Sequence, residues 1–206
     1  MKDLILSMMV SLDGYVARPD GNLDWFRSDG ELEAETLALL RDVDAMVFGR
    51  VSYLLLAEYW PAAGATAAGA TAAAAPGGLT GGERGLELAR LMNSIPKIVV
   101  SGTLRTAPWG PATIVGEGLA EELTRMKREA RRDLVCFAGA DLAFTLMSLG
   151  LVDQYRLLVH PIVLGTGIPL FHGLEPEQRL ELTRTRTFPS GVVLLHYRRD
   201  RRAATA

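Results

Sequence analysis

Cysteine is almost absent from this sequence of 206 residues, since Cys136 is the only one. A single cysteine excludes an internal disulfide and a multi-cysteine metal site. Cys136 lies in the apolar run 134–138, which predicts a small buried side chain rather than a nucleophile. The sequence also lacks an apolar run long enough to span a membrane, and its first residues lack a signal-peptide pattern. We therefore expect a cytoplasmic protein that does not contact a membrane.

An excess of charge of one sign is lacking as well. The chain has 22 basic and 24 acidic residues and a formal net charge of −2, so no overall field would attract nucleic acid. The three histidines are scattered, which predicts no metal site, and His160 before Pro161 is interpreted as a core or edge residue rather than a base. A P-loop is missing, and the Rossmann fingerprint fails because Glu121 stands where its third glycine belongs.

Apolar runs alternate with amphipathic stretches along most of the chain. Strands are predicted at 4–10, 45–48, 98–100, 113–115, 134–138, 155–159, 182–188 and 192–198. Helices are predicted at 51–60, 83–93 and 117–132. Two further helices are predicted, one that follows a capping box beginning at Ser28 and one that begins at a capping Asp141 and ends at Gly150. Because the last strands have no helices between them, the order predicts a single-domain α/β fold. It has a mixed, mostly parallel sheet of eight strands, helices on both faces and an antiparallel C-terminal hairpin.

Residues 62–82 consist almost entirely of Ala, Gly, Thr and Pro. Alanine favours a helix, but the scattered glycines and Pro76 oppose it. A long irregular connection of this kind is either a mobile insert or a functional lid, and the composition favours the mobile insert. We expect one domain over residues 1–199 with this insert at 62–82, and a tail at 200–206.

Polar and glycine-rich segments follow the predicted strands, where an open α/β sheet binds its ligands. The groups that suit an anionic dinucleotide are Gly49, Arg50, Ser52, Ser101, Gly102, Thr103 and Gly139. Arg50 offers a planar fork of donors for a phosphate, and the glycines let backbone N–H groups approach a pyrophosphate near helix N-termini. Asp141, interpreted as a helix cap, is the one acidic residue at these strand ends. The pattern therefore favours the 2′-phosphate of NADPH over NADH.

Four motifs stand in a fixed order along the chain. They are Ser-Leu-Asp-Gly-Tyr-Val-Ala at 11–17 with Asp20-Gly21 and Asp24-Trp25, Phe-Gly-Arg-Val-Ser-Tyr at 48–53, Lys-Ile-Val-Val-Ser at 97–101, and Gly-Leu-Val-Asp at 150–153 with the segment 160–171. Together they resemble the dihydrofolate-reductase-like superfamily. The resemblance is greatest to the C-terminal reductase domain of the bifunctional riboflavin-biosynthesis deaminase/reductase, and it runs from about Leu4 to Tyr197. No zinc-deaminase segment is present, so the chain does not resemble the other half of that enzyme.

The resemblance implies an NADPH-dependent reductase that passes a hydride to a carbonyl or imine carbon of a small heterocycle, as 5-amino-6-(5-phosphoribosylamino)uracil reductase does. By the same resemblance, Gly49, Arg50, Ser52 and Ser101 would hold the adenosine phosphates. The turn Ala138-Gly139-Ala140 would hold the pyrophosphate. The family usually has a Gly-Gly pair where this chain has Ala138-Gly139, and the extra methyl could crowd the pyrophosphate. Many members are homodimers, which we also expect here.

Reduction of a polarised double bond needs a proton as well as a hydride. Asp13 ends the first strand, and burial there would raise its pKa and make it an acid; a simple Asp-Gly turn explains it equally well. Asp24 and Glu31 are reserve acids. Asp24, Trp25 and Tyr53 are candidate substrate contacts, although aromatic residues more often pack in a core. Dihydrofolate reductase and a catalytically silent nucleotide-binding homologue are the alternative functions.

Overall fold

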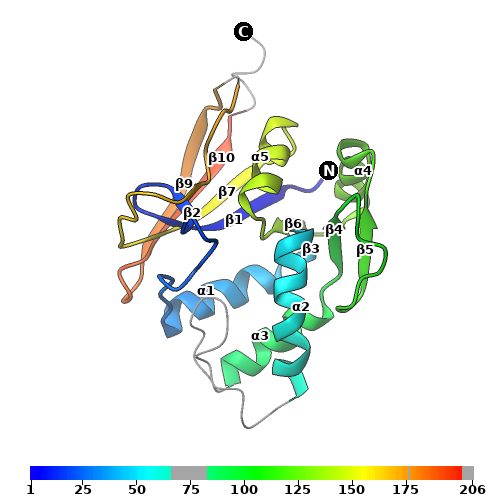
Figure 1. Ribbon diagram of the computed structural model, residues 1–206, viewed down its shortest axis with the longest axis horizontal. Helices are drawn as coiled ribbons and strands as arrows, with labels where there is room; N and C mark the ends of the chain where they lie inside the picture. Colours follow the sequence, from blue (N-terminus) through cyan, green and yellow to red (C-terminus); the bar gives the residue numbers. More distant parts are fainter. Residues whose placement is uncertain (66–82, 176, 201–206) are drawn as a thin grey trace.

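Eight strands form a continuous sheet through the molecule, and the central strands are apolar and buried (Figure 1). The computed structural model describes residues 1–65, 83–175 and 177–200. The sheet contains β1 (Leu4–Ser11), β3 (Val43–Gly49), β4 (Lys97–Val100), β5 (Ala112–Val115), β6 (Asp133–Cys136), β7 (Gln154–His160), β9 (Leu180–Thr187) and β10 (Val193–Arg199). Their order is β5-β4-β3-β6-β1-β7-β10-β9. The pairs from β5 to β7 are parallel, and β10 pairs antiparallel with β7 and β9, which confirms the predicted architecture.

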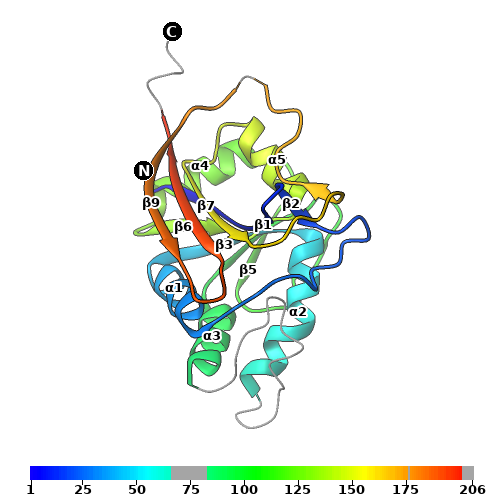
Figure 2. The same ribbon diagram turned by 90° about the vertical axis from the view of Figure 1, so that its left-hand side faces the viewer.

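Helices cover both faces of this sheet, as predicted (Figure 2). The apolar side chains of α4 (Leu119–Glu129) and α5 (Ala140–Ser148) pack on one face, around Leu6, Val47 and Leu134. On the other face, α1 (Gly30–Arg41), α2 (Arg50–Ala65) and α3 (Glu83–Ser94) pack around Met46 and Val99. Strand residues therefore alternate between two cores. Cys136 is fully buried on β6, as predicted, and this burial raises the pKa of its thiol.

Helix caps are the least accurate part of the sequence prediction. The N-cap of α1 is Asp29 rather than Ser28, because the Asp29 carboxylate accepts hydrogen bonds from the backbone of Glu31 (2.8 Å) and Leu32 (3.0 Å). Asp141 does not cap α5. The N-cap is Gly139, and Asp141 lies in the first turn, where its charge still favours the positive end of the helix dipole.

Two further predictions differ from the structure. A small second sheet pairs β2 (Tyr15–Ala17) with β8 (Ile168–Pro169), and both strands are too short to show a period of two. The helix α2 continues to Ala65, past Pro61, so residues 62–65 are helical rather than part of an irregular insert.

The remainder of the predicted mobile insert, 66–82, and the tail at 201–206 lie outside the described residues. Within the described ranges, no helix has the length and apolarity needed to cross a membrane.

A buried ion pair ties α4 to the start of the sheet. Lys127 and Asp153 are both 3% exposed, and the Lys127 ammonium donates to the Asp153 carboxylate and to the Leu151 carbonyl (3.1 Å). Asp153 also accepts from the backbone N–H of Leu4 (2.8 Å). Sequence reasoning did not predict this pair, because a lysine on an amphipathic helix is usually solvated.

We expect Lys127→Met to lower the free energy of unfolding by about 3–5 kcal/mol, because it leaves a buried carboxylate without its counterion. Urea denaturation measures the change. The double variant Lys127→Met/Asp153→Asn is the control. It keeps an acceptor for the Leu4 N–H but removes the charge, so it should recover part of the loss. A double variant as unstable as the single one would contradict the ion-pair account.

Candidate functional site

The carboxyl ends of the six parallel strands lie along one edge of the sheet, and the polar segments follow them. β3 and β4 are paired up to Gly49 and Val100, so the segments 49–52 and 101–103 start side by side. β6 pairs with β3 on its other side, and the segment 138–140 follows it. The structure therefore brings together all nine residues that were predicted to contact a cofactor.

The N-termini of α2 and α5 lie close to each other, and a glycine stands at each. A methyl group at Gly139 would lie 3.6 Å from Ser52 Oγ, and one at Gly49 would lie 3.5 Å from Leu142 Cβ. Gly139 is the N-cap of α5, and no side chain caps that helix. The first N–H groups of α5 therefore lack a side-chain acceptor at an end of the helix that attracts anions.

Arg50 begins α2 at this edge of the sheet and is exposed. Its guanidinium has no hydrogen bond or ion pair with any residue that the structure describes. Next to it along the edge, Ser101 Oγ accepts from the backbone N–H groups of Thr103 (3.2 Å) and Leu104 (2.9 Å). These bonds fix the loop after β4 and leave the Ser101 O–H as a donor. The arrangement offers one unpaired cation, a hydroxyl donor and the uncapped end of α5 to an anion.

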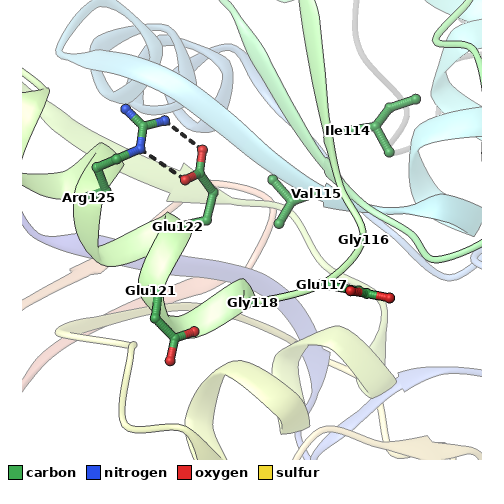
Figure 3. A pocket seen from close by; sticks show the side chains of 8 residues that line it. All are labelled: Ile114, Val115, Gly116, Glu117, Gly118, Glu121, Glu122 and Arg125. Atoms are coloured by element: carbon green, nitrogen blue, oxygen red, sulfur yellow. Dashed lines mark hydrogen bonds and ion pairs between the residues drawn. The ribbon is translucent and has the colours of Figure 1, made fainter.

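A cavity of about 470 Å³ opens beside this loop, at the end of β5 (Figure 3). Ser101 N–H donates to the Val115 carbonyl (2.9 Å), which places the cavity next to Ser101. The lining residues are Ile114, Val115, Gly116, Glu117, Gly118, Glu121, Glu122 and Arg125. Arg125 points toward Glu122 and pairs with it and with Glu129, whereas Glu117 and Glu121 point elsewhere. The cavity is therefore acidic, and a phosphate is favoured on the Arg50 side of β4.

Glu117 corrects one expectation from the sequence. Asp141 is not the one acidic residue at this edge, because Glu117 follows β5 by two residues. Glu117 was predicted to lie at the start of the helix 117–132 and so was not counted among the residues at the strand ends. A carboxylate at a strand end can accept hydrogen bonds from ribose hydroxyls. Glu117 therefore weakens the argument for NADPH that rested on the scarcity of acidic residues at the strand ends, whereas the argument from Arg50 and the hydroxyl groups is unaffected.

The predicted rise in the pKa of Asp13 is wrong. Asp13 is exposed, and its carboxylate accepts from the Ser11 hydroxyl (2.6 Å) and from the backbone N–H groups of Gly165 (2.7 Å) and Leu164 (3.1 Å). The Ser11 bond above all, and then the two backbone bonds, lower the pKa of Asp13. Asp13 is therefore ionised at neutral pH, and it ties the turn after β1 to the loop after β7. These contacts match the turn interpretation.

The reserve acids are engaged elsewhere. Asp24 pairs with Arg18 (2.7 Å) in the segment before α1, and Glu31 pairs with Arg186 of β9 (2.8 Å). Tyr53 is fully buried, and its hydroxyl donates to the Trp109 carbonyl (2.9 Å) and accepts from the Trp109 N–H (2.8 Å). Tyr53 therefore packs in the core, which was the alternative to a substrate contact that the sequence analysis gave for an aromatic residue.

The segment before α1 folds over His160, which sequence reasoning did not anticipate. His160 is 0% exposed at the end of β7, as expected of a core histidine. Its ring stacks on Phe26 and meets Trp25 edge to face, with both ring centroids 5.3 Å away. Burial, with a smaller effect of Arg27, lowers the pKa of His160 to about 4, so its ring is neutral at pH 7. Trp25 itself is 6% exposed.

Three comparisons place the chain among known proteins. The family model of the RibD C-terminal domain matches residues 2–194. The uncharacterized protein YyaP of Bacillus subtilis (strain 168) is 32% identical, over 94% of this chain and 93% of YyaP.

Solved structures share the fold. A putative riboflavin biosynthesis protein from Shewanella sp. PV-4 has a TM-score of 0.72 and 22% identity, with 98% of this chain and 100% of that chain covered. Dihydrofolate reductase from Enterococcus faecalis, solved with NADP(H), has a TM-score of 0.59 and 11% identity, with 96% of each chain covered. These likenesses confirm the dihydrofolate-reductase-like fold that the motifs indicated.

The contacts of Asp13 predict how stability depends on pH. A carboxyl group whose pKa is lower in the folded state than in the unfolded state stabilises the fold above the unfolded pKa and loses this effect as the pH falls. Asp13→Asn should therefore be less stable than the wild type at pH 7, and the difference should shrink as the pH falls below about 4. Thermal unfolding from pH 7 to pH 3 measures it. A difference in stability between the two proteins that grows as the pH falls would contradict the stabilising role of the Asp13 hydrogen bonds.

Proposed function

The chain belongs to the RibD C-terminal domain family, and on this premise we propose that it is an NADPH-dependent reductase of a small heterocyclic substrate. The observation that carries the proposal is the Arg50 guanidinium, which has no partner among the described residues, near the uncapped N-terminus of α5. NADPH would supply the hydride, and the substrate would accept it at a carbonyl or imine carbon.

The donors at the sheet edge suit a dinucleotide that lies across the strand ends. Arg50, Ser101 and Thr103 would bind the 2′-phosphate end, and Ser52 would lie between it and the pyrophosphate. Backbone N–H groups at Gly49, Gly102 and the turn 138–140 would approach the phosphates closely. This order leaves the nicotinamide toward the ends of β1 and β7. Asp24 and Trp25 border that end and remain our predicted substrate contacts, whereas the buried Tyr53 could act only through packing.

The family favours a substrate like that of 5-amino-6-(5-phosphoribosylamino)uracil reductase, which the motifs resemble. The Shewanella protein, described as a putative riboflavin biosynthesis protein, points the same way. Dihydrofolate reductase is the less favoured alternative, because at 11% identity its likeness concerns the fold alone. A catalytically silent nucleotide-binding homologue is the third alternative, motivated by Ala138. Since Asp13 is held as an anion, we propose that it positions the loops at the nicotinamide end rather than donating the proton.

Arg50→Ala should raise the Kd for NADPH about 10- to 100-fold, because a charge-assisted hydrogen bond to a phosphate contributes about 1.5–3 kcal/mol. The Kd for NADH should change by less than about threefold, since NADH has no 2′-phosphate. Titrations followed by tryptophan fluorescence measure both constants.

Arg90→Ala is the matched control, because Arg90 is an exposed arginine on α3, away from the strand ends. It should leave both constants unchanged. Equal losses for NADPH and NADH in Arg50→Ala would show that Arg50 does not recognise the 2′-phosphate.

Gly139→Ala separates cofactor binding from folding. The new methyl group meets Ser52 Oγ at an ordinary distance of 3.6 Å, and the backbone of Gly139 (φ −79°, ψ 170°) suits alanine. The free energy of unfolding should therefore change by no more than about 1 kcal/mol, the size of an N-cap effect. The methyl group would keep a pyrophosphate from the α5 N–H groups, so the Kd for NADPH should rise at least about tenfold.

Ala138→Gly is the counterpart, because it restores the Gly-Gly pair that is usual in the family. It should tighten NADPH binding. NADPH affinity that neither variant changes would place the pyrophosphate elsewhere. The predicted homodimer and the cytoplasmic location stay predictions.

A further inference from the structure

The connection from β4 to β5, residues 101–111, carries part of the proposed cofactor site although it contains no helix or strand. Ser101 and Thr103, which would bind the 2′-phosphate end, lie at its start. Only two of its residues are buried, Ser101 at one end and Trp109 near the other, and those between them are exposed or half-buried. The place of this connection along the sheet edge therefore depends on how Ser101 and Trp109 are held.

Trp109 is held by a tyrosine in the first turn of α2. The Tyr53 hydroxyl donates to the Trp109 carbonyl (2.9 Å) and accepts from the Trp109 backbone N–H (2.8 Å). The two rings also pack together, with their centroids 5.7 Å apart. One hydroxyl group thus satisfies both backbone groups of a buried residue, and water does not compete for either bond because Tyr53 is fully buried too.

The indole of Trp109 is fixed as well. Its Nε1–H donates to Asn93 Oδ1 (2.7 Å), and Asn93 Nδ2 donates to the carbonyl of Trp60 in α2 (2.9 Å). The Lys97 ammonium lies over the ring, 4.5 Å from its centroid. Trp109 is therefore joined to α2 directly through Tyr53 and a second time through Asn93 of α3.

Tyr53 shares the first turn of α2 with Arg50 and Ser52. This turn presents Arg50 at the end of β3, and the connection presents Ser101 at the end of β4, which pairs with β3. The contact between Tyr53 and Trp109 therefore links the two segments that would bind one phosphate. Groups that are already held in place bind a ligand without the entropic cost of ordering them.

We propose that Tyr53 is a positioning residue for recognition of the 2′-phosphate. By fixing Trp109, its hydroxyl holds the connection 101–111 where Ser101 and Arg50 face the same phosphate. This inference rests on the proposed NADPH-dependent function and adds to it a residue that touches neither cofactor nor substrate. Because NADH lacks the 2′-phosphate, Tyr53 affects the preference between the two dinucleotides and not only the stability of the fold.

Tyr53→Phe tests the proposal, because it keeps the ring and removes the hydroxyl. It should raise the Kd for NADPH about five- to twentyfold and change the Kd for NADH by less than about twofold. A purely structural loss would instead reduce the amount of competent protein for both dinucleotides alike. Isothermal titration calorimetry of the whole protein, below the melting transition of every variant, measures both constants.

Tyr155→Phe is the matched control. Tyr155 is also a buried tyrosine with a hydrogen-bonded hydroxyl, whose partner is Gln178, but it lies near the start of β7 and away from the strand ends. The control should lower the melting temperature, as Tyr53→Phe does, and leave both dissociation constants unchanged. Trp109→Phe removes the indole bond to Asn93 and should also lower the preference for NADPH, so it decides the question if Tyr53→Phe does not fold.

A double-mutant cycle with Arg50→Ala shows whether Tyr53 acts through the phosphate site. When Arg50 is already absent, Tyr53→Phe should raise the Kd for NADPH by less than about twofold, because the group to which the connection is matched is gone. Independent sites would give the full effect of Tyr53→Phe in both backgrounds, and that result would overturn the positioning role.

The outcomes separate this inference from the function on which it rests. A preference for NADPH that falls in Tyr53→Phe and not in Tyr155→Phe supports the positioning role. If Arg50→Ala weakens NADPH binding but Tyr53→Phe changes both dinucleotides equally or neither, the positioning role is overturned and the reductase function stands. A wild type that binds no NADPH overturns the reductase function, and the positioning role with it.

Discussion

The parallel pairing of β3 between β4 and β6 is the constraint on which the candidate site depends. Parallel strands have their carboxyl ends at the same edge, so this pairing brings segments from residues 49, 101 and 138 together. The close approach of α2 and α5 follows, with Gly49 near Leu142 and Gly139 near Ser52. Without that approach, Arg50 and the N-terminus of α5 would not face one ligand.

Much of the fold could be predicted because its central strands are buried on both faces. Continuous apolar runs such as 4–10 and 134–138 indicate parallel strands, and the helixless end of the chain indicates an antiparallel hairpin. The predicted cofactor residues were found with one rule, that an open α/β sheet binds its ligands at the carboxyl ends of its strands. The short β2 and β8 could not be predicted, because a strand of two or three residues has no readable period.

The electrostatics of the site could not be predicted, because they depend on partners distant in the chain. For Asp13 a buried acid and a simple turn residue were equally expected, and the Ser11 hydroxyl above all, then N–H groups about 150 residues away, hold it as an anion. Glu117 was predicted to begin a helix, and its position at the strand end next to that of β4 appears only when β5 is paired with β4. Likewise, His160 was predicted to be a core or edge histidine and is a core one, but the stacking of Phe26 on its ring depends on how the segment 18–29 folds back.

Hydrogen exchange of the whole protein with and without NADPH tests the central claim most directly. Backbone amides at 49–52, 101–103 and 138–140 belong to three separate strand ends that the fold unites. The account predicts that NADPH slows exchange in all three segments together and has less effect in β9, at the far edge of the sheet. Protection that misses these segments, or no protection at saturating NADPH, would contradict the assignment of this edge as a dinucleotide site.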